Sequence, residues 1–155
     1  MSTRTAVAML LFVSFYSPFS FAQPIPNAKT CVAALSTTGE RVKVRDHVGD
    51  PAGFTAYATY DADGWPSITY APAFFVLPPT VQTFLSLHEC GHLVLHTTNE
   101  FLANCYAIAQ GDWTPDELAL IERSHISVGA LPSQYVGSGA AFWAKTKATC
   151  PSYFQ

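Results

Sequence analysis

Residues 88–92 read His-Glu-Cys-Gly-His and lie within an expected helix that follows Pro78-Pro79, with Thr80 as its N-cap. Apolar residues at helical spacing precede the motif, which supports the helix. Two histidines four residues apart face the same side of an α-helix, about one turn from each other. Their imidazoles can bind one Zn²⁺, and the intervening Glu89 can reach a water on that metal. The motif therefore predicts a metal site on this helix.

The third ligand must come from outside this helix. A catalytic zinc usually has three protein ligands and one open position. His96 continues the four-residue spacing, but it would lie about 12 Å from His88 along the helix axis. Glu100 stands after the break in helical periodicity, where the chain can turn back toward the metal. We therefore take Glu100 as the candidate third ligand of one zinc ion per chain.

Asn104 lies one turn beyond Glu100 on the next expected helix. A ligating histidine normally donates its other ring N–H to a fixed acceptor, and the Asn104 amide oxygen can serve. Both residues also have ordinary interpretations. Glu100 can be a first-turn glutamate favoured by the helix dipole, and Asn104 a surface amide.

The HExxH motif followed by Glu100-x-x-Ala103-Asn104 resembles the gluzincin metallopeptidases, and in particular small gluzincins and the HtpX-like and ImmA/IrrE-type groups. The likeness covers residues 68–107. It implies a zincin-like fold and a zinc-dependent metalloendopeptidase, in which a zinc-activated water hydrolyses the peptide bond and Glu89 is the general base.

The resemblance also implies where a peptide or protein substrate binds. The strand before the active-site helix would pair with the extended substrate, and it contains Ser67, Ile68, Thr69 and Tyr70. A hydrogen-bond donor to the oxyanion is also expected, and the candidates are His125, Tyr135 and Tyr106. His125 has an alternative interpretation as a core histidine, because it shares a helix face with apolar residues.

The first 22 residues have the pattern of a secretory signal peptide. A charge at Arg4 precedes an apolar run, and Ser20 and Ala22 are small residues at the positions that a signal peptidase needs. We expect cleavage near Ala22 and a secreted or periplasmic protein; an uncleaved anchor is the alternative. Residues 23–155 are expected to form a single domain without a membrane span, because no apolar run in them approaches about 18 residues.

Four cysteines in an exported chain favour two disulfides. Three pairings are open. Cys90–Cys105 would join the two ligand-bearing helices, and Cys31–Cys150 would then tie the termini. The net charge is −3 with no basic patch, which argues against nucleic acid as a partner. We expect a monomer.

The order of expected elements indicates an α+β fold, with a small antiparallel sheet followed by the active-site helix and a helical C-terminal half. The sheet would use a strand over residues 41–48 and a hairpin whose strands span 54–60 and 65–70. A short helix is expected over 29–35, and later helices over 80–96, 99–110, 114–127 and 134–148. A Thr-Pro-Asp-Glu capping box starts the third of these later helices.

Two functions of different classes fit this pattern. The first is an exported zinc endopeptidase. The alternative is a non-catalytic zincin-like binding module with a structural zinc, which the small size favours because little room remains for a deep cleft. A third possibility is a disulfide-bonded protein in which the motif is accidental.

Overall fold

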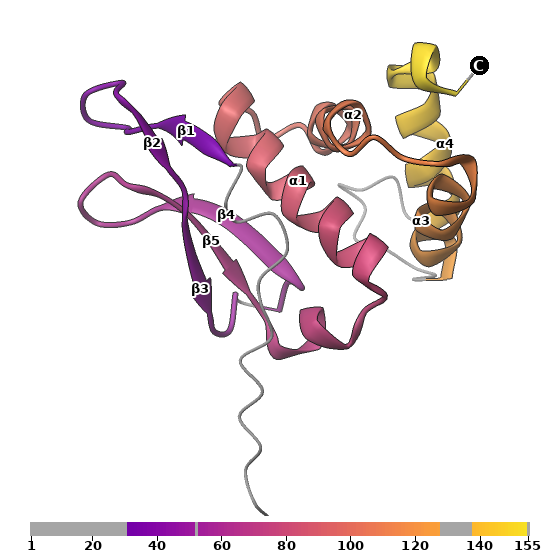
Figure 1. Cartoon of the computed structure of the whole chain (residues 1–155), viewed down its shortest axis with the longest axis horizontal. Coiled ribbons are helices and arrows are strands. Elements are labelled where there is room, and N and C mark those ends of the chain that lie inside the picture. Colours follow the sequence, from indigo (N-terminus) through magenta and orange to yellow (C-terminus); the bar gives the residue numbers. More distant parts are fainter. Residues whose placement is uncertain (1–30, 52, 128–137, 155) are drawn as a thin grey trace, which may run out of the picture.

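The computed structural model describes residues 31–51, 53–127 and 138–154 of the chain, and it is an α+β protein as the sequence predicts (Figure 1). The expected signal peptide and its cleavage point at Ala22 lie outside these residues. Within the described part, no helix has the length and apolar character needed to cross a membrane.

Within the described residues, five short strands form two sheets. Strands β1 (Val32–Ala34) and β2 (Arg41–Lys43) make an antiparallel pair. Strands β3 (Arg45–Val48), β4 (Ala56–Tyr60) and β5 (Pro66–Tyr70) make a second sheet in the order β3-β5-β4. The predicted β4–β5 hairpin is confirmed, and β3 runs parallel to β5. The sheet is therefore mixed, which corrects the expectation of an antiparallel one.

Two local predictions at this end of the chain are wrong. The short helix expected over residues 29–35 is replaced by strand β1, and the single strand expected over 41–48 is divided into β2 and β3. The division falls at Val44, which is 3% exposed and whose N–H bonds to the Cys31 carbonyl. Burial of Val44 and Ala33 and the link to Cys31 outweigh the local helix preference of this segment, because propensity is a weak prior against tertiary packing.

Four α-helices follow the sheets in the part of the chain that the structure describes, and most of their limits agree with the sequence. They are α1 (Pro79–Leu95), α2 (Glu100–Gln110), α3 (Pro115–Ser127) and α4 (Gly139–Thr149). The N-cap of helix α1 is Pro78, two residues earlier than the expected Thr80, because Pro79 suits the first helical position. The Thr114–Glu117 capping box is confirmed. Helix α4 starts after Ser138, whose hydroxyl accepts the Ala141 N–H, and the expected start at residue 134 lies outside the described residues.

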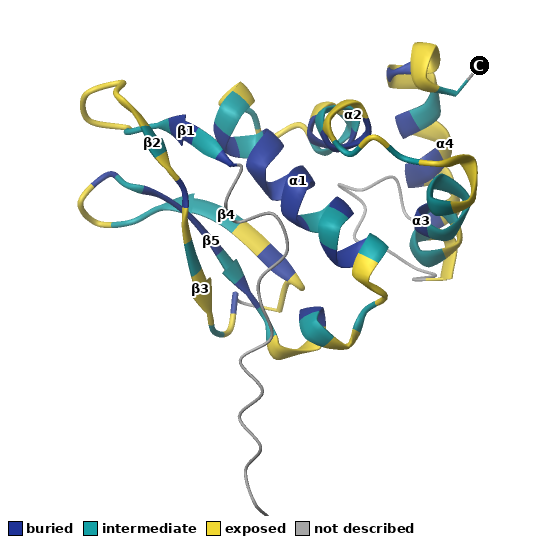
Figure 2. Cartoon of the chain, in the orientation of Figure 1, coloured by how far each residue is buried: buried dark blue, intermediate teal, exposed yellow. Residues whose placement is uncertain are grey.

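Helix α1 lies at the centre of the molecule, between the sheets and the other helices (Figure 1). One apolar cluster joins α1 to the sheet side and includes Ile68, Tyr70 and Phe74. A second joins it to α2, α3 and α4, and includes Phe84 and Trp143. Figure 2 shows that much of α1 is buried in consequence, and residues 88–91 of its HExxH motif are buried while His92 is half-buried.

All four cysteines form disulfides, so the prediction of two bonds is confirmed. The favoured pairing is wrong, because the bonds are Cys31–Cys90 and Cys105–Cys150. Cys90 lies on the side of α1 that packs against the first cluster, where it meets Cys31 beside β1. Its neighbour Gly91 packs against α2, and Sγ of Cys90 itself lies 3.8 Å from the hydroxyl of Tyr106 in α2. Cys90 is nevertheless bonded to Cys31, because Cys105 of α2 is joined to Cys150, which follows α4.

Candidate metal centre

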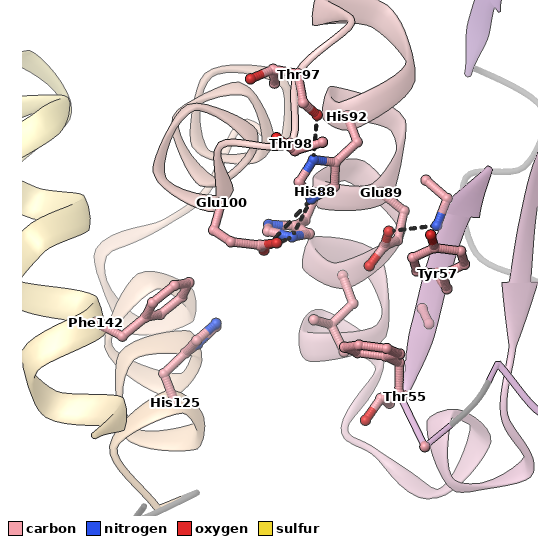
Figure 3. Close-up of a pocket in the computed structure, with 15 residues that line it drawn as sticks. Thr55, Tyr57, His88, Glu89, His92, Thr97, Thr98, Glu100, His125 and Phe142 are labelled. Carbon is pink, nitrogen blue, oxygen red and sulfur yellow. Dashed lines mark hydrogen bonds and ion pairs between the residues drawn. The ribbon is translucent and has the colours of Figure 1, made fainter. Parts of the chain in front are cut away.

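His88, His92 and Glu100 bring three ligand atoms to one point (Figure 3). The two histidine Nε2 atoms are 3.1 Å apart. Oε2 of Glu100 lies 3.0 Å from Nε2 of His88 and 3.6 Å from Nε2 of His92. These three atoms form what we call the ligand triangle. A tetrahedral zinc ion with ordinary bond lengths separates its ligand atoms by roughly 3.3–3.6 Å, close to the distances in the ligand triangle. The predicted group can therefore hold a metal ion, and Glu100 belongs to it.

The other ring nitrogen of each histidine has a fixed acceptor. Nδ1 of His88 lies 2.7 Å from Oδ1 of Asn104, which is the contact expected from the sequence. Nδ1 of His92 lies 2.8 Å from the backbone oxygen of Thr97. When both Nδ1 atoms carry protons, both Nε2 lone pairs face the triangle, as metal binding requires.

Thr97 was not singled out from the sequence, because its acceptor is a backbone atom. Helix α1 ends at Leu95, and its C-cap His96 adopts a left-handed conformation with φ of 49°. That turn brings the Thr97 N–H to the His92 carbonyl and the Thr97 carbonyl to the His92 ring. The break in periodicity after residue 96 was a visible signal of the turn, though not of its hydrogen bond.

The start of α2 places Glu100 beside the histidines. Asn99 caps this helix, and its side-chain oxygen accepts the N–H groups of Phe101 and Leu102 at 3.0 and 3.2 Å. Glu100 is thus the first residue of the helix, where the dipole favours a negative charge. Close packing at Gly91 lets α2 approach α1, since a Cβ there would lie 3.1 Å from the Ala103 Cα.

The charges at the triangle are coupled. Burial opposes ionisation of Glu100, but its hydrogen bonds with His88 and His92 prevail and lower its pKa to about 2. Burial also opposes the charged form of His92, but the bonds to Glu100 and the Thr97 carbonyl raise its pKa overall. An ionised carboxylate beside two imidazoles forms a site that attracts a cation.

Glu89 leaves α1 on the side facing strand β4 (Figure 3). Its side chain is buried, and Oε2 accepts the Ala58 N–H at 2.9 Å, which orients the carboxylate. Burial raises the pKa of Glu89, although the neighbouring His88 and His92 act in the opposite direction. A carboxylate with a raised pKa is a better proton acceptor near neutral pH.

A cleft of about 540 Å³ opens at the triangle and at Glu89. Its walls come from the start of β4, from α1 and from residues of the other helices; beyond the site residues they include Phe54, Tyr57, Ala58, Leu85, Thr98 and Phe142. Most of the named side chains are apolar. The cleft is large enough for part of an extended peptide.

The strand that faces this cleft is β4, not β5. Residues Ser67, Ile68, Thr69 and Tyr70 lie in β5, which pairs with β3 on one side and with β4 on the other. Because both of its edges are used, the prediction that it pairs with a substrate is wrong. Among the described strands, β4 forms one edge of this sheet, and its Ala58 N–H points away from β5 to Glu89. The parallel pairing of β3, which decides this order, has no signal in the local sequence.

The three residues expected as oxyanion donors differ in where they lie and in what their polar atoms contact. His125 lines the cleft, but its Nδ1 lies 2.9 Å from the Ile121 carbonyl, so this nitrogen carries the proton. Burial lowers the pKa of His125, and the neutral ring then presents an acceptor, not a donor, at Nε2. The Tyr106 hydroxyl lies 3.8 Å from Sγ of Cys90, in a separate cavity. Tyr135 lies outside the described residues.

Comparisons with models of protein families, with curated proteins and with solved structures find no match for this chain. The case for a function therefore rests on the residues of the site.

Proposed function

We propose that this protein is an exported zinc metallopeptidase of the gluzincin type, which hydrolyses peptide bonds in an extended peptide or protein substrate. The observation that carries the proposal is the convergence of His88, His92 and Glu100 at a cleft that Glu89 also lines. Three protein ligands, with room for a fourth group from the cleft, are typical of catalytic zinc; structural zinc usually has four protein ligands.

The donor set favours zinc among the common metals. Two imidazole nitrogens and one carboxylate oxygen are the ligands found in His₂Glu zinc enzymes, whereas Ca²⁺ and Mg²⁺ prefer oxygen ligands throughout. Zinc at this position supplies a Lewis acid, which lowers the pKa of a coordinated water and polarises a carbonyl group. The low pKa of Glu100 keeps that ligand ionised over the physiological range.

Glu89 is the proton acceptor in this proposal. The Ala58 N–H holds one carboxylate oxygen and so limits rotation of the side chain. Its raised pKa favours removal of a proton from water and later delivery of that proton to the leaving amine. General base catalysis of this kind contributes about 10²–10⁴ to the rate.

The edge of β4 is the proposed docking strand for the substrate. The Ala58 N–H is used by Glu89, but hydrogen-bond directions alternate along a strand, so Ala56 presents its N–H and C=O groups to the same side, together with the Ala58 carbonyl. An extended peptide added there would run past Glu89 and the ligand triangle. The apolar rings of Phe54, Tyr57 and Phe142 favour substrates with apolar side chains near the scissile bond.

Export is proposed from the N-terminal sequence, and the two disulfides are consistent with an oxidising compartment.

The test combines bound zinc with cleavage of a peptide library by the disulfide-bonded protein. Glu89→Gln is expected to retain zinc and to lose activity by about 10²-fold or more. Glu100→Gln is expected to weaken zinc binding, and the exposed Glu40→Gln is a control that changes neither. Zinc binding without cleavage of any peptide would favour the non-catalytic module. Absence of zinc binding would overturn both metal-dependent functions.

A further inference from the structure

A series of buried hydrogen bonds links the proposed metal ligand His88 to helix α4. Nδ1 of His88 bonds to Oδ1 of Asn104 at 2.7 Å. Nδ2 of Asn104 then donates to Oγ1 of Thr146 in α4 at 2.8 Å. Oγ1 of Thr146 donates in turn to the Phe142 carbonyl at 3.2 Å. Asn104 and Thr146 are both 0% exposed, so these groups are separated from bulk solvent.

The donors and acceptors in this series of hydrogen bonds can be assigned in one consistent way. The Phe142 carbonyl can only accept, so the single hydroxyl proton of Thr146 points to it. The Thr146 oxygen is then left as an acceptor for the Asn104 NH₂ group, and the amide oxygen of Asn104 faces His88. That oxygen requires a proton on Nδ1 of His88. The lone pair of Nε2 is consequently directed at the ligand triangle.

An amide, unlike a carboxylate, has one donating end and one accepting end. Rotation of the Asn104 amide by half a turn would present NH₂ to His88 and would require Nδ1 to be an acceptor. The proton of a neutral His88 ring would then lie on Nε2, inside the triangle, where it competes with a metal ion. The orientation of this amide therefore matters for metal binding.

We propose that Thr146 is a positioning residue of the metal site, which sets the orientation of the Asn104 amide and through it the tautomer of His88. This inference rests on the proposed metal-dependent function. It makes α4 part of the site, although Thr146 is separated from Asn104 by 42 residues in the sequence.

The second disulfide supports this arrangement. Cys105 follows Asn104 directly in α2, and its partner Cys150 stands one turn after Thr146, where its N–H bonds to the Thr146 carbonyl at 3.1 Å. The Cys105–Cys150 bond thus joins α2 to α4 close to the Asn104–Thr146 contact and limits sliding of one helix along the other.

The test measures zinc affinity by chelator competition and, separately, the unfolding of the metal-free protein. Thr146→Val retains the shape of the side chain but removes the acceptor, and it is expected to weaken zinc binding about 10-fold or more. Thr146→Ser retains the hydroxyl and is expected to restore affinity to within about three-fold of wild type. Without that rescue, the proposal is overturned.

Two controls separate positioning from general damage to α4. Thr149→Val removes an equivalent hydroxyl bond to a carbonyl four residues earlier on the exposed side of α4, and Ile121→Val destabilises the same core. Neither is expected to change zinc affinity. A weakening by Ile121→Val equal to that by Thr146→Val would assign the effect to stability and overturn the proposal.

A double-mutant cycle tests whether Thr146 acts through Asn104. In an Asn104→Ala background, Thr146→Val is expected to change affinity by less than about two-fold, because no amide remains to be oriented. If the double variant loses zinc affinity by the product of the two single losses, the proposal is contradicted. If wild type binds zinc and Thr146→Val binds equally well, this inference alone fails. If wild type binds no zinc, the proposed function fails with it.

Discussion

Gly91 lies inside the HExxH motif, where α1 packs closely against α2, and Gly91→Ala is a sharp test of that packing. An added Cβ would lie 3.1 Å from the Ala103 Cα, 3.1 Å from the Tyr106 Cβ and 3.2 Å from the Ala103 carbonyl oxygen. Favourable carbon contacts are about 3.5–4.0 Å. Two of these three neighbours are backbone atoms of α2, so a side-chain rotation cannot relieve the contact.

Two opposing effects determine the size of the change. Alanine in a helix interior is more favourable than glycine by about 1 kcal/mol. Insertion of a methyl group into a packed interface costs about 1–3 kcal/mol. We therefore expect a net loss of about 0–2 kcal/mol in the free energy of unfolding. Displacement of α2 also moves Glu100 and Asn104 relative to His88, and zinc affinity should fall about 10-fold.

The assay is urea denaturation of the metal-free protein, followed by chelator competition for zinc. Gly49→Ala is the matched control, because its Cβ would make an ordinary contact of 3.5 Å with the Thr69 methyl group. That variant should be neutral or slightly more stable, with unchanged affinity. If Gly91→Ala were about 1 kcal/mol more stable than wild type and bound zinc normally, the packing argument would be refuted.

Three further predictions concern the supports of the site. Asn99→Ala should lower the unfolding free energy by about 1 kcal/mol through loss of the α2 cap, whereas Asn99→Asp should nearly preserve it in the same urea titration. Replacement of Cys105 and Cys150 by serine should cost roughly 4 kcal/mol, because their bond closes a loop of 45 residues; a loss below about 1 kcal/mol would contradict this. The pKa of His125 is lowered, so the unfolded chain binds more protons and stability should fall as the pH drops below 6.5. The expected slope of the unfolding free energy is up to about 1.4 kcal/mol per pH unit, and His125→Gln should lack this contribution. Identical pH profiles of the unfolding free energy for wild type and His125→Gln would refute the prediction.

Local sequence signals predicted the helical half of the molecule well. The limits of α2 and α3 follow from the Asn99 cap and the Thr114–Glu117 capping box, which act within one turn of chain. The β4–β5 hairpin follows from its turn residues in the same way. The strands at the start of the described chain did not follow local preference, because Val44 and Cys31 depend on partners distant in sequence.

Part of the candidate site could be predicted from the sequence, because it too depends on signals between near neighbours in the chain. His88 and His92 share a helix face by spacing alone, and Glu100 follows the first break in that helix. The acceptor for His92 is a backbone carbonyl at Thr97, and Thr146 joins the site from a separate helix. Neither has a distinctive pattern of residue types in the sequence.

The sequence by itself determined which residues can bind a metal and that two of them lie on one helix, because hydrogen bonds between near neighbours set helix phase and helix ends. Only the tertiary structure decided the disulfide pairing, the edge strand at the cleft and the partner of the Asn104 amide. These features depend on which faces of α1 are covered by the sheet, by α2 and by α3, and on which face of α2 is covered by α4. That choice results from the burial of apolar surface over the whole chain, and no short segment encodes it.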